Sequence, residues 1–236
     1  MRFLESLRFP APSELRRMAL KYKKRTSVGV DHLHPRHYGF LSDEALQCLI
    51  TLWRWMLTLG SPPEVVSTII VSLLPKPEGG DCPDRPVANF ATCIRLLTRW
   101  FRSTYGKLWS DSNRRPYVYG ITGASSLHCV WKHSLLAEYA ASKGLEVYSI
   151  LLDIAKAFEN VLHHILVRRA LDLGFNIWLL KFLLALYRGP RVIVVGSVPG
   201  VLVHATQTIV AGCAFADLLM RCMLIEDLDH IVALHR

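Results

Sequence analysis

The sequence VYSILLDIAKAFENV, residues 147–161, is the stretch from which we predict the fold. Its first part is typical of a β-strand, because it is rich in β-branched, aromatic and aliphatic residues and holds neither Gly nor Pro. The apolar run ends on one acid, Asp153, and an aromatic residue, Phe158, follows five positions later. An acid at the end of a buried strand is costly unless a cation or hydrogen bonds meet it. The pattern therefore predicts a carboxylate presented at the edge of a sheet, where it could bind a metal ion.

The segment resembles motif A of reverse transcriptases, most closely those of non-LTR retrotransposons, whose pattern is D-x-x-K-A-F-D/E. Here the pattern reads DIAKAFE, from Asp153 to Glu159. The resemblance implies that Asp153 binds two catalytic Mg²⁺ ions, with help from the backbone carbonyl of Ile154. It also implies that Phe158 lies under the sugar of the incoming deoxynucleotide and excludes a 2′-OH. Without the resemblance, the same residues can be explained as a helix-capping Asp and a core Phe.

The composition is that of a folded, basic chain. It has 236 residues, of which 51% are hydrophobic, so it can form a core and does not have the composition of a disordered protein. The 28 Lys and Arg residues against 19 Asp and Glu give a formal net charge of +9. This excess favours a polyanionic partner, although a basic globular protein without such a partner has the same balance.

The cysteine pattern and the apolar windows bear on the compartment. The six cysteines include no C-x-x-C pair, so we expect neither a zinc site nor a disulfide framework, and a reducing compartment fits better. The N-terminus lacks the apolar core of a secretory signal. The most apolar windows are interrupted and fall short of the roughly 20 residues that a membrane span needs. We therefore expect an intracellular protein, nuclear or cytoplasmic, that is not secreted and has no membrane partner.

The first sixty residues contain a basic cluster and one strongly marked helix. Residues 21–25, KYKKR, could contact phosphates or form only a solvated face. In the helix that follows, Ser42 is the expected N-cap and Gly60 the stop. Its apolar residues fall at helical spacing, and we expect both Trp53 and Trp55 in or near the core.

Two extended segments meet at the loop 78–83, with Lys76 before the loop and Arg85 after it. The first is the apolar run 65–74, and the second begins at Arg85. A hairpin of this kind suits closure on a triphosphate, because Lys supplies a point charge and Arg a planar fork of donors. The text resembles the LxPKPG…RPI fingers motifs of the same family, which implies that Lys76 and Arg85 contact the incoming nucleotide. Two exposed basic residues at a surface hairpin are the alternative.

Further helices are predicted at residues 92–108, 127–141, 163–173 and 177–187, and a hairpin at 191–203. His163 and His164 are adjacent on a helix and so point about 100° apart. We expect them on the helix surface and not as a pair of metal ligands.

The segment TQTIVAGCAFADLLM, residues 206–220, occupies the place of motif B, which typically reads GVxQGxxxSPLLF. Gly212 aligns with the Gly of that motif, while Ala211 stands where the family has Gln. A residue without Cβ lets the backbone approach a ligand closely. The resemblance implies that Ala211 and Gly212 shape the nucleotide pocket, without the amide that the family's Gln supplies.

Two-metal phosphoryl transfer needs carboxylates from two places, which hold Mg²⁺ ions roughly 3.5–4 Å apart. In the family the second source is motif C, a hairpin with an x-Asp-Asp turn, and the sequence contains no such turn after motif B. The late acids Glu226, Asp227 and Asp229 lie in a predicted helix. The resemblance covers about residues 29–230 and ends about where motif C is expected to begin.

The predicted fold is therefore α+β, with the fingers and partial palm of a right-hand polymerase and no thumb. We expect a basic lead-in at 1–28, a fingers-like region at 29–146, and a partial palm at 147–236. The resemblance implies a fragment of an RNA-directed DNA polymerase, a nucleotidyltransferase that is inactive alone. Its partners would be an RNA template, a DNA primer and deoxynucleoside triphosphates, and its cofactor Mg²⁺ once the site is complete.

Two alternatives remain open. The chain could be a catalytically dead nucleic-acid-binding remnant of such a polymerase. An RNA-directed RNA polymerase or an intron maturase relative is a third hypothesis, against which the Ala157–Phe158 pair argues.

A palm sheet without its central strands would leave an exposed apolar edge.

Overall fold

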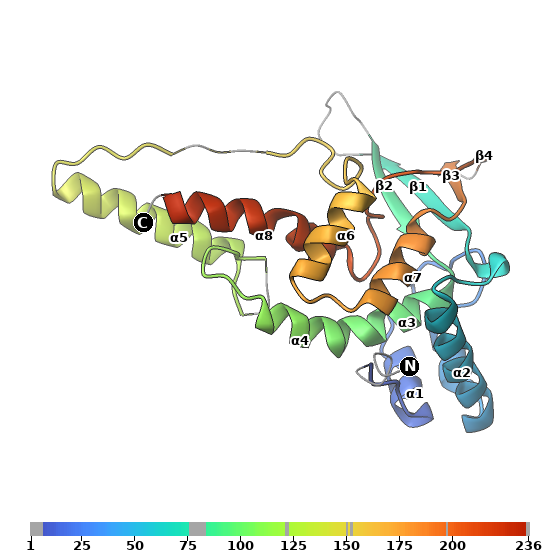
Figure 1. Ribbon diagram of the computed structural model, residues 1–236. Helices are drawn as coiled ribbons and strands as arrows, with labels where there is room; N and C mark the ends of the chain where they lie inside the picture. Colours follow the sequence, from blue (N-terminus) through green and yellow to red (C-terminus); the bar gives the residue numbers. More distant parts are fainter. Residues whose placement is uncertain are drawn as a thin grey trace.

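The computed structural model describes residues 7–75, 84–120, 123–149, 151, 153–196 and 198–234, with the side chains at 75, 84 and 85 outside that description (Figure 1). Helices and a small sheet alternate along the chain. The helical elements, in chain order, are α1 (Pro12–Leu20), η1 (Pro35–Phe40), α2 (Asp43–Leu59), η2 (Glu64–Val66), α3 (Thr92–Ser103), α4 (Tyr105–Ser112), α5 (Ser126–Ser142), α6 (His163–Asp172), α7 (Ile177–Tyr187) and α8 (Ala216–Leu234).

The sheet has four strands in the order β2-β1-β3-β4. Strands β1 (Ile69–Pro75) and β2 (Asp84–Asn89) pair antiparallel, and β3 (Arg191–Val195) and β4 (Val198–Val203) form a second antiparallel pair. Both predicted hairpins are therefore confirmed. Strand β3 runs parallel to β1, with Val194 opposite Ser72, so one sheet joins segments from both sides of residue 146. The fold is α+β with a small mixed sheet, and the predicted α+β class is therefore confirmed.

Helix α2 begins and ends where the sequence places it. The hydroxyl of Ser42 accepts a hydrogen bond from the backbone N–H of Ala45, and Gly60 ends the helix in the left-handed conformation at φ 76°. Trp53 is fully buried, as expected, but Trp55 is 64% exposed. The prediction for Trp55 is wrong because side chains two positions apart on an α-helix point about 200° apart around its axis. The indoles of Trp53 and Trp55 therefore face opposite sides of α2.

A single apolar core joins all three regions expected from the sequence. Its members include Leu15 of α1, Leu57 of α2, Phe101 of α3, Leu183 of α7 and Cys222 of α8. Helix α7 is apolar on nearly every face and packs against α2 and α6, as a helix buried on several sides does. The predicted lead-in, fingers and palm regions thus share one interior.

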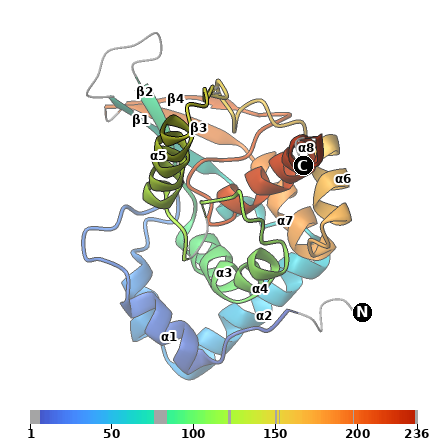
Figure 2. The same ribbon diagram turned by 90° about the vertical axis from the view of Figure 1, so that its left-hand side faces the viewer.

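Helix α5 and the extended chain after it form an arm that stands away from this core (Figures 1 and 2). Among the described residues of α5, Ala140 is the one that is buried. The extended segment returns along the helix, with Ser149 Oγ 3.0 Å from His133 Nε2. Large apolar side chains are exposed on both parts, including Trp131 at 66% and Leu151 at 95%. Exposed apolar surface is therefore concentrated on this arm.

The strand predicted at residues 147–152 is not present among the described residues of that segment. An isolated extended segment gains no ladder hydrogen bonds, and each of its apolar side chains stays in water unless a neighbouring strand or helix covers it. Here the sheet is built from β1 to β4 instead, and the segment runs beside α5. In the part of the chain that the structure describes, no helix has the length and apolarity needed to cross a bilayer.

The two indoles of α2 give a matched test of the core. We expect Trp53→Ala to lower the free energy of unfolding by about 3–5 kcal/mol, since a fully buried aromatic side chain is removed and a cavity is left. The control, Trp55→Ala, removes the same side chain from an exposed position and should change it by less than about 0.5 kcal/mol. Urea denaturation measures both, and equal losses would contradict the packing of α2.

Candidate active site

The loop before α8 is tied to the chain around Phe158 by two backbone hydrogen bonds. The N–H of Ile209 donates to the carbonyl of Phe158 at 2.8 Å, and the N–H of Thr208 donates to that of Val161 at 3.0 Å. Ile209 is also buried. The two segments that resemble motifs A and B are thus held side by side, although they are far apart in the sequence.

The same loop closes on the outer edge of β2. The N–H of Ala88 donates to the carbonyl of Ala211 at 3.2 Å, so the loop supplies a partner to a strand edge that would otherwise be open. Gly212 follows at φ 107°, and a Cβ placed there would lie 2.6 Å from the carbonyl oxygen of Ala88. Only a residue without a side chain fits this approach, because both the backbone conformation and the space exclude one.

These contacts enclose a cavity of about 310 Å³. Strand β2, the segment 158–159 and the loop each contribute two of its lining residues, which are Pro86, Val87, Phe158, Glu159, Ala211 and Gly212. Three residues selected from the sequence, namely Phe158, Ala211 and Gly212, therefore line one cavity. Its wall is mainly apolar, and Glu159 is the one ionisable side chain among the lining residues.

Asp153 and Ile154 do not line this cavity. Asp153 is exposed, and Ile154 is 53% exposed, in the extended chain that leads back from the α5 arm. The carboxylate therefore does not end a buried strand, and the burial cost that motivated a metal at this position is absent from this conformation. A tight turn follows, with Lys156 in the left-handed region at φ 48° and its carbonyl accepting from Asn160 at 3.1 Å.

The two basic residues expected at a triphosphate are only partly placed. Lys76 lies outside the described residues. Arg85 belongs to β2, with its Cα opposite that of Leu74, but its side chain is outside the description. Strand β2 continues from Arg85 directly to Pro86 and Val87, so the backbone that carries Arg85 leads into the cavity wall.

The late acids of α8 are engaged elsewhere. Arg169 binds the carboxylates of both Glu226 and Asp227 at 2.8 Å, and Arg115 binds Asp229 at 3.0 Å. The hydrogen bonds to Asp227 and Asp229 raise the pKa of these two arginines. Residue 226 is ten positions beyond the start of α8, or about 15 Å along its axis. These acids therefore fasten the end of α8 to the chain that precedes it.

Across the described ranges, no group of three or more His, Cys, Asp or Glu side chains is arranged to hold a metal ion. Glu159 at the cavity and Asp153 outside it are the carboxylates of the motif A segment. In this conformation the described residues form a mainly apolar cavity of about 310 Å³ without a gathered carboxylate cluster.

His163 is a residue of the site that sequence reasoning missed. It is buried, not on the helix surface as expected, whereas its neighbour His164 is exposed. Nε2 of His163 lies 2.8 Å from the carbonyl of Thr208, and Nδ1 accepts a hydrogen bond from Nε of Arg188 at 3.2 Å. The neutral ring with its proton on Nε2 satisfies both contacts. His163 therefore holds the loop that carries Ala211 and Gly212.

Two comparisons with known proteins give no match: neither the models of known protein families nor the curated proteins contain one for this chain. What the chain has in common with reverse transcriptases is therefore a resemblance in the motifs quoted above.

A glycine pair tests the close approach to β2. We expect Gly212→Ala to lower the free energy of unfolding by about 1–3 kcal/mol, because the new Cβ would be strained and would meet the carbonyl of Ala88. The matched control is Gly120→Ala, where no atom lies within 4 Å of the added Cβ and φ is not positive. Chemical denaturation of the three proteins measures the difference, and an unaffected Gly212 variant would contradict the contact.

The buried imidazole predicts a pH dependence. Burial, and then the neighbouring Arg188 and Arg191, lower the pKa of His163 from its ordinary value of 6.5, although the hydrogen bond to Thr208 acts in the other direction. The unfolded chain thus binds a proton at His163 more readily than the folded chain. Its contribution to stability is full above about pH 6.5 and is lost as the pH falls toward the lowered pKa.

We therefore expect the stability difference between the native protein and His163→Gln to shrink from about pH 7.5 to about pH 5.5. Urea unfolding at the two pH values measures it, and His164→Gln is the exposed control. A difference that stays constant across this range would show that His163 does not titrate with folding.

Proposed function

We propose that this chain contains the fingers and part of the palm of an RNA-directed DNA polymerase of the non-LTR retroelement type, and that the cavity beside Phe158 receives a deoxynucleoside triphosphate. In the complete polymerase Asp153 and the carbonyl of Ile154 would bind Mg²⁺, and Lys76 and Arg85 would contact the triphosphate. The substrates would be an RNA template, a DNA primer and deoxynucleotides.

The observation that supports this proposal is the assembly of one cavity from three separate segments. Phe158 comes from the segment that resembles motif A, Ala211 and Gly212 from the one that resembles motif B, and Pro86 from the strand that carries Arg85. A cavity of about 310 Å³ with mainly apolar walls and a few polar groups is of the kind that small ligands occupy.

The same structure favours the view that the chain does not polymerise alone. Asp153 is exposed and lies apart from the cavity lining. The acids of α8 that could supply a second pair of ligands are bound by Arg115 and Arg169. Two-metal catalysis requires carboxylates converging on two ions, and the described residues do not gather them. This observation also favours the second candidate function, a nucleic-acid-binding remnant without catalysis.

Nucleotide binding is the direct test of the cavity. In the presence of Mg²⁺ and an annealed RNA–DNA primer–template, fluorescent deoxyadenosine triphosphate should bind to the native chain. Ala211→Trp should abolish that binding, because an indole would fill the space between β2 and Phe158. The matched control is Ala141→Trp, which places the same side chain at an exposed position of α5. Equal binding by both variants would refute the proposed nucleotide site.

Primer extension tests the expectation that the chain is inactive alone, and nucleotide binding separates the two candidate functions. With RNA template, DNA primer, Mg²⁺ and deoxynucleotides, we expect no product above that of Asp153→Ala, for want of a second carboxylate source. If the native chain extends the primer and the Asp153→Ala variant does not, the expectation of inactivity is wrong. Binding of the primer–template without nucleotide binding would favour the non-catalytic remnant.

A further inference from the structure

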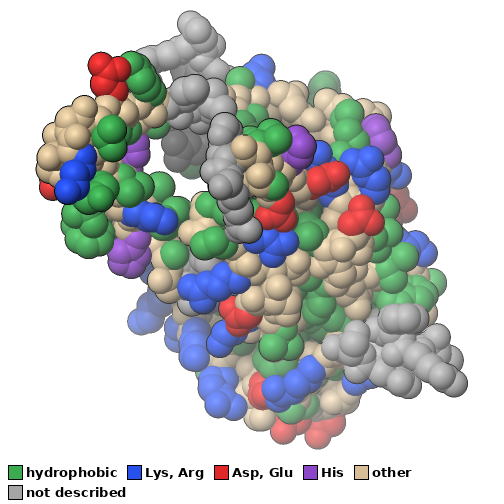
Figure 3. All heavy atoms as spheres, turned by 60° about the vertical axis from the view of Figure 1, so that its left-hand side comes forward, with side chains coloured by type: hydrophobic (Ala, Val, Ile, Leu, Met, Phe, Trp, Pro, Cys, Tyr) green, Lys and Arg blue, Asp and Glu red, His purple; other side chains and the backbone are tan. Residues whose placement is uncertain are grey.

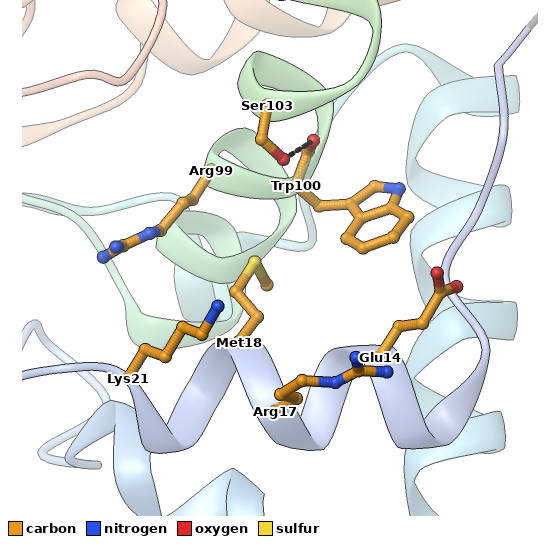
Figure 4. A pocket seen from close by; sticks show the side chains of 7 residues that line it. All are labelled: Glu14, Arg17, Met18, Lys21, Arg99, Trp100 and Ser103. Carbon is orange, nitrogen blue, oxygen red and sulfur yellow. Dashed lines mark hydrogen bonds between the residues drawn. The ribbon is translucent and has the colours of Figure 1, made fainter.

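A second pocket, of about 340 Å³, lies between α1 and α3, and none of its residues lines the cavity beside Phe158 (Figure 4). Figure 4 shows Met18 of α1 facing Trp100 of α3 across it, with Lys21 and Arg99 at one end and Arg17 with Glu14 at the other. Three cations from two helices thus surround a partly apolar floor.

Within the described ranges, no ion pair joins Arg17, Lys21 or Arg99 to a carboxylate. Glu14, the one acid of the pocket lining, is already occupied: it accepts a hydrogen bond from the N–H of Ala11 at 2.9 Å and pairs with Arg8 at 2.6 Å. Those contacts lower its pKa, to which Arg17 adds a smaller effect.

Arg99 is held in place by an aromatic ring. Its guanidinium lies 4.3 Å from the ring centroid of Tyr22, which is buried, and Arg95 stacks on the same ring at 5.8 Å. A guanidinium placed over an aromatic face keeps the N–H donors at its edge available for an anion. The arrangement limits the rotamer freedom of Arg99 before any ligand binds.

The positive charge continues beyond the pocket along the chain. Residues 15–30 contain no acid, and the run from Lys21 to Arg25 adds further exposed cations, Lys23 and Lys24 among them. Figure 3 shows Lys and Arg side chains gathered on the lower part of one face. A strip of cations suits a polyanion with regularly spaced charges better than a single small anion.

We propose that the groove between α1 and α3 binds the phosphodiester backbone of a single-stranded nucleic acid. Arg17, Lys21 and Arg99 contact successive phosphates, while the half-buried Met18 packs against sugar or base. An anionic membrane fits less well, because the apolar residues of α1, such as Leu15 and Ala19, are buried and leave no exposed apolar stripe. The site does not depend on the nucleotide cavity and exists in a polymerase or in a remnant alike.

The test is fluorescence anisotropy with an unstructured 12-nucleotide oligouridylate and the DNA oligonucleotide of the same length, at several salt concentrations. In Arg17→Gln/Lys21→Gln/Arg99→Gln, we expect binding about 100-fold weaker at ~0.1 M salt, since each phosphate contact to a single strand contributes a factor of about 5 there. The slope of log K against log salt should fall in magnitude by about 2. Both oligonucleotides share the phosphodiester, and a preference between them identifies the natural strand.

The matched control removes three charges elsewhere. Lys107→Gln/Lys132→Gln/Lys143→Gln changes exposed residues of α4 and of the α5 region and should weaken binding less than threefold. Lys21→Glu alone, an exposed change outside the core, supports the site if it weakens binding while thermal unfolding stays unchanged. Equal losses in the two triple variants would overturn the proposal in favour of net charge alone.

Two further outcomes would overturn it. The first is unchanged oligonucleotide binding by the Arg17/Lys21/Arg99 variant. The second is tighter binding to phosphatidylserine vesicles than to either oligonucleotide, lost in the same variant, which would assign the groove to a membrane surface. Neither outcome affects nucleotide binding beside Phe158, which uses a different probe and different residues.

Discussion

The backbone hydrogen bonds between the 208–209 loop and the 158–161 segment are the constraint on which the rest of the site depends. They bring together two parts of the chain that no local propensity would join. Once the loop is held there, Ala211 meets the free edge of β2 and Gly212 must pass within contact distance of Ala88. The cavity beside Phe158 is the space that remains between these three pieces of backbone.

Buried polar groups make this arrangement specific. The buried ring of His163, at the start of α6, contacts the carbonyl of Thr208 in the loop through Nε2, and its Nδ1 accepts a hydrogen bond from the exposed Arg188 just after α7. A buried donor or acceptor left unpaired costs about 1–3 kcal/mol, so a loop that moved away would leave Nε2 of His163 without its partner. Thr208 also has a positive φ of 128°, a conformation that surrounding contacts must enforce. The loop is thus positioned by α6 and α7.

The features that the sequence predicted well are those with local causes. Ser42 and Gly60 mark the ends of α2 because capping and left-handed turns are set by a few neighbouring residues. The two hairpins follow from apolar runs interrupted by Gly and Pro. Gly212 was expected to let the backbone approach a ligand, which stays a prediction, and in the structure it lies close to Ala88. What the glycine approaches, strand β2, could not be inferred, because that contact joins distant segments.

The wrong predictions for residues 147–152 and for His163 concern distant partners, whereas that for Trp55 concerns helix geometry. Residues 147–152 have the composition of a strand, but a strand also needs a neighbour, and composition does not say whether one is present. His163 was placed on a surface because nothing near it in the sequence indicates Thr208 or Arg188. Trp55 shares its helix and its residue type with Trp53, so only its position around the helix axis distinguishes it. Tertiary contacts therefore decided the first two cases, and the helical period decided the third.

Amide hydrogen exchange of the native chain, with and without a deoxynucleoside triphosphate and Mg²⁺, tests the assembled cavity most directly. The account predicts that the amides of Ala88, Thr208 and Ile209 exchange as slowly as those in the middle of α6, because each donates within the protein. It also predicts that the amides of Glu159 and Gly212 slow further when the nucleotide is added. Exchange of Thr208 and Ile209 at the rate of an unstructured chain would contradict the joining of the two segments, and with it the proposed nucleotide site.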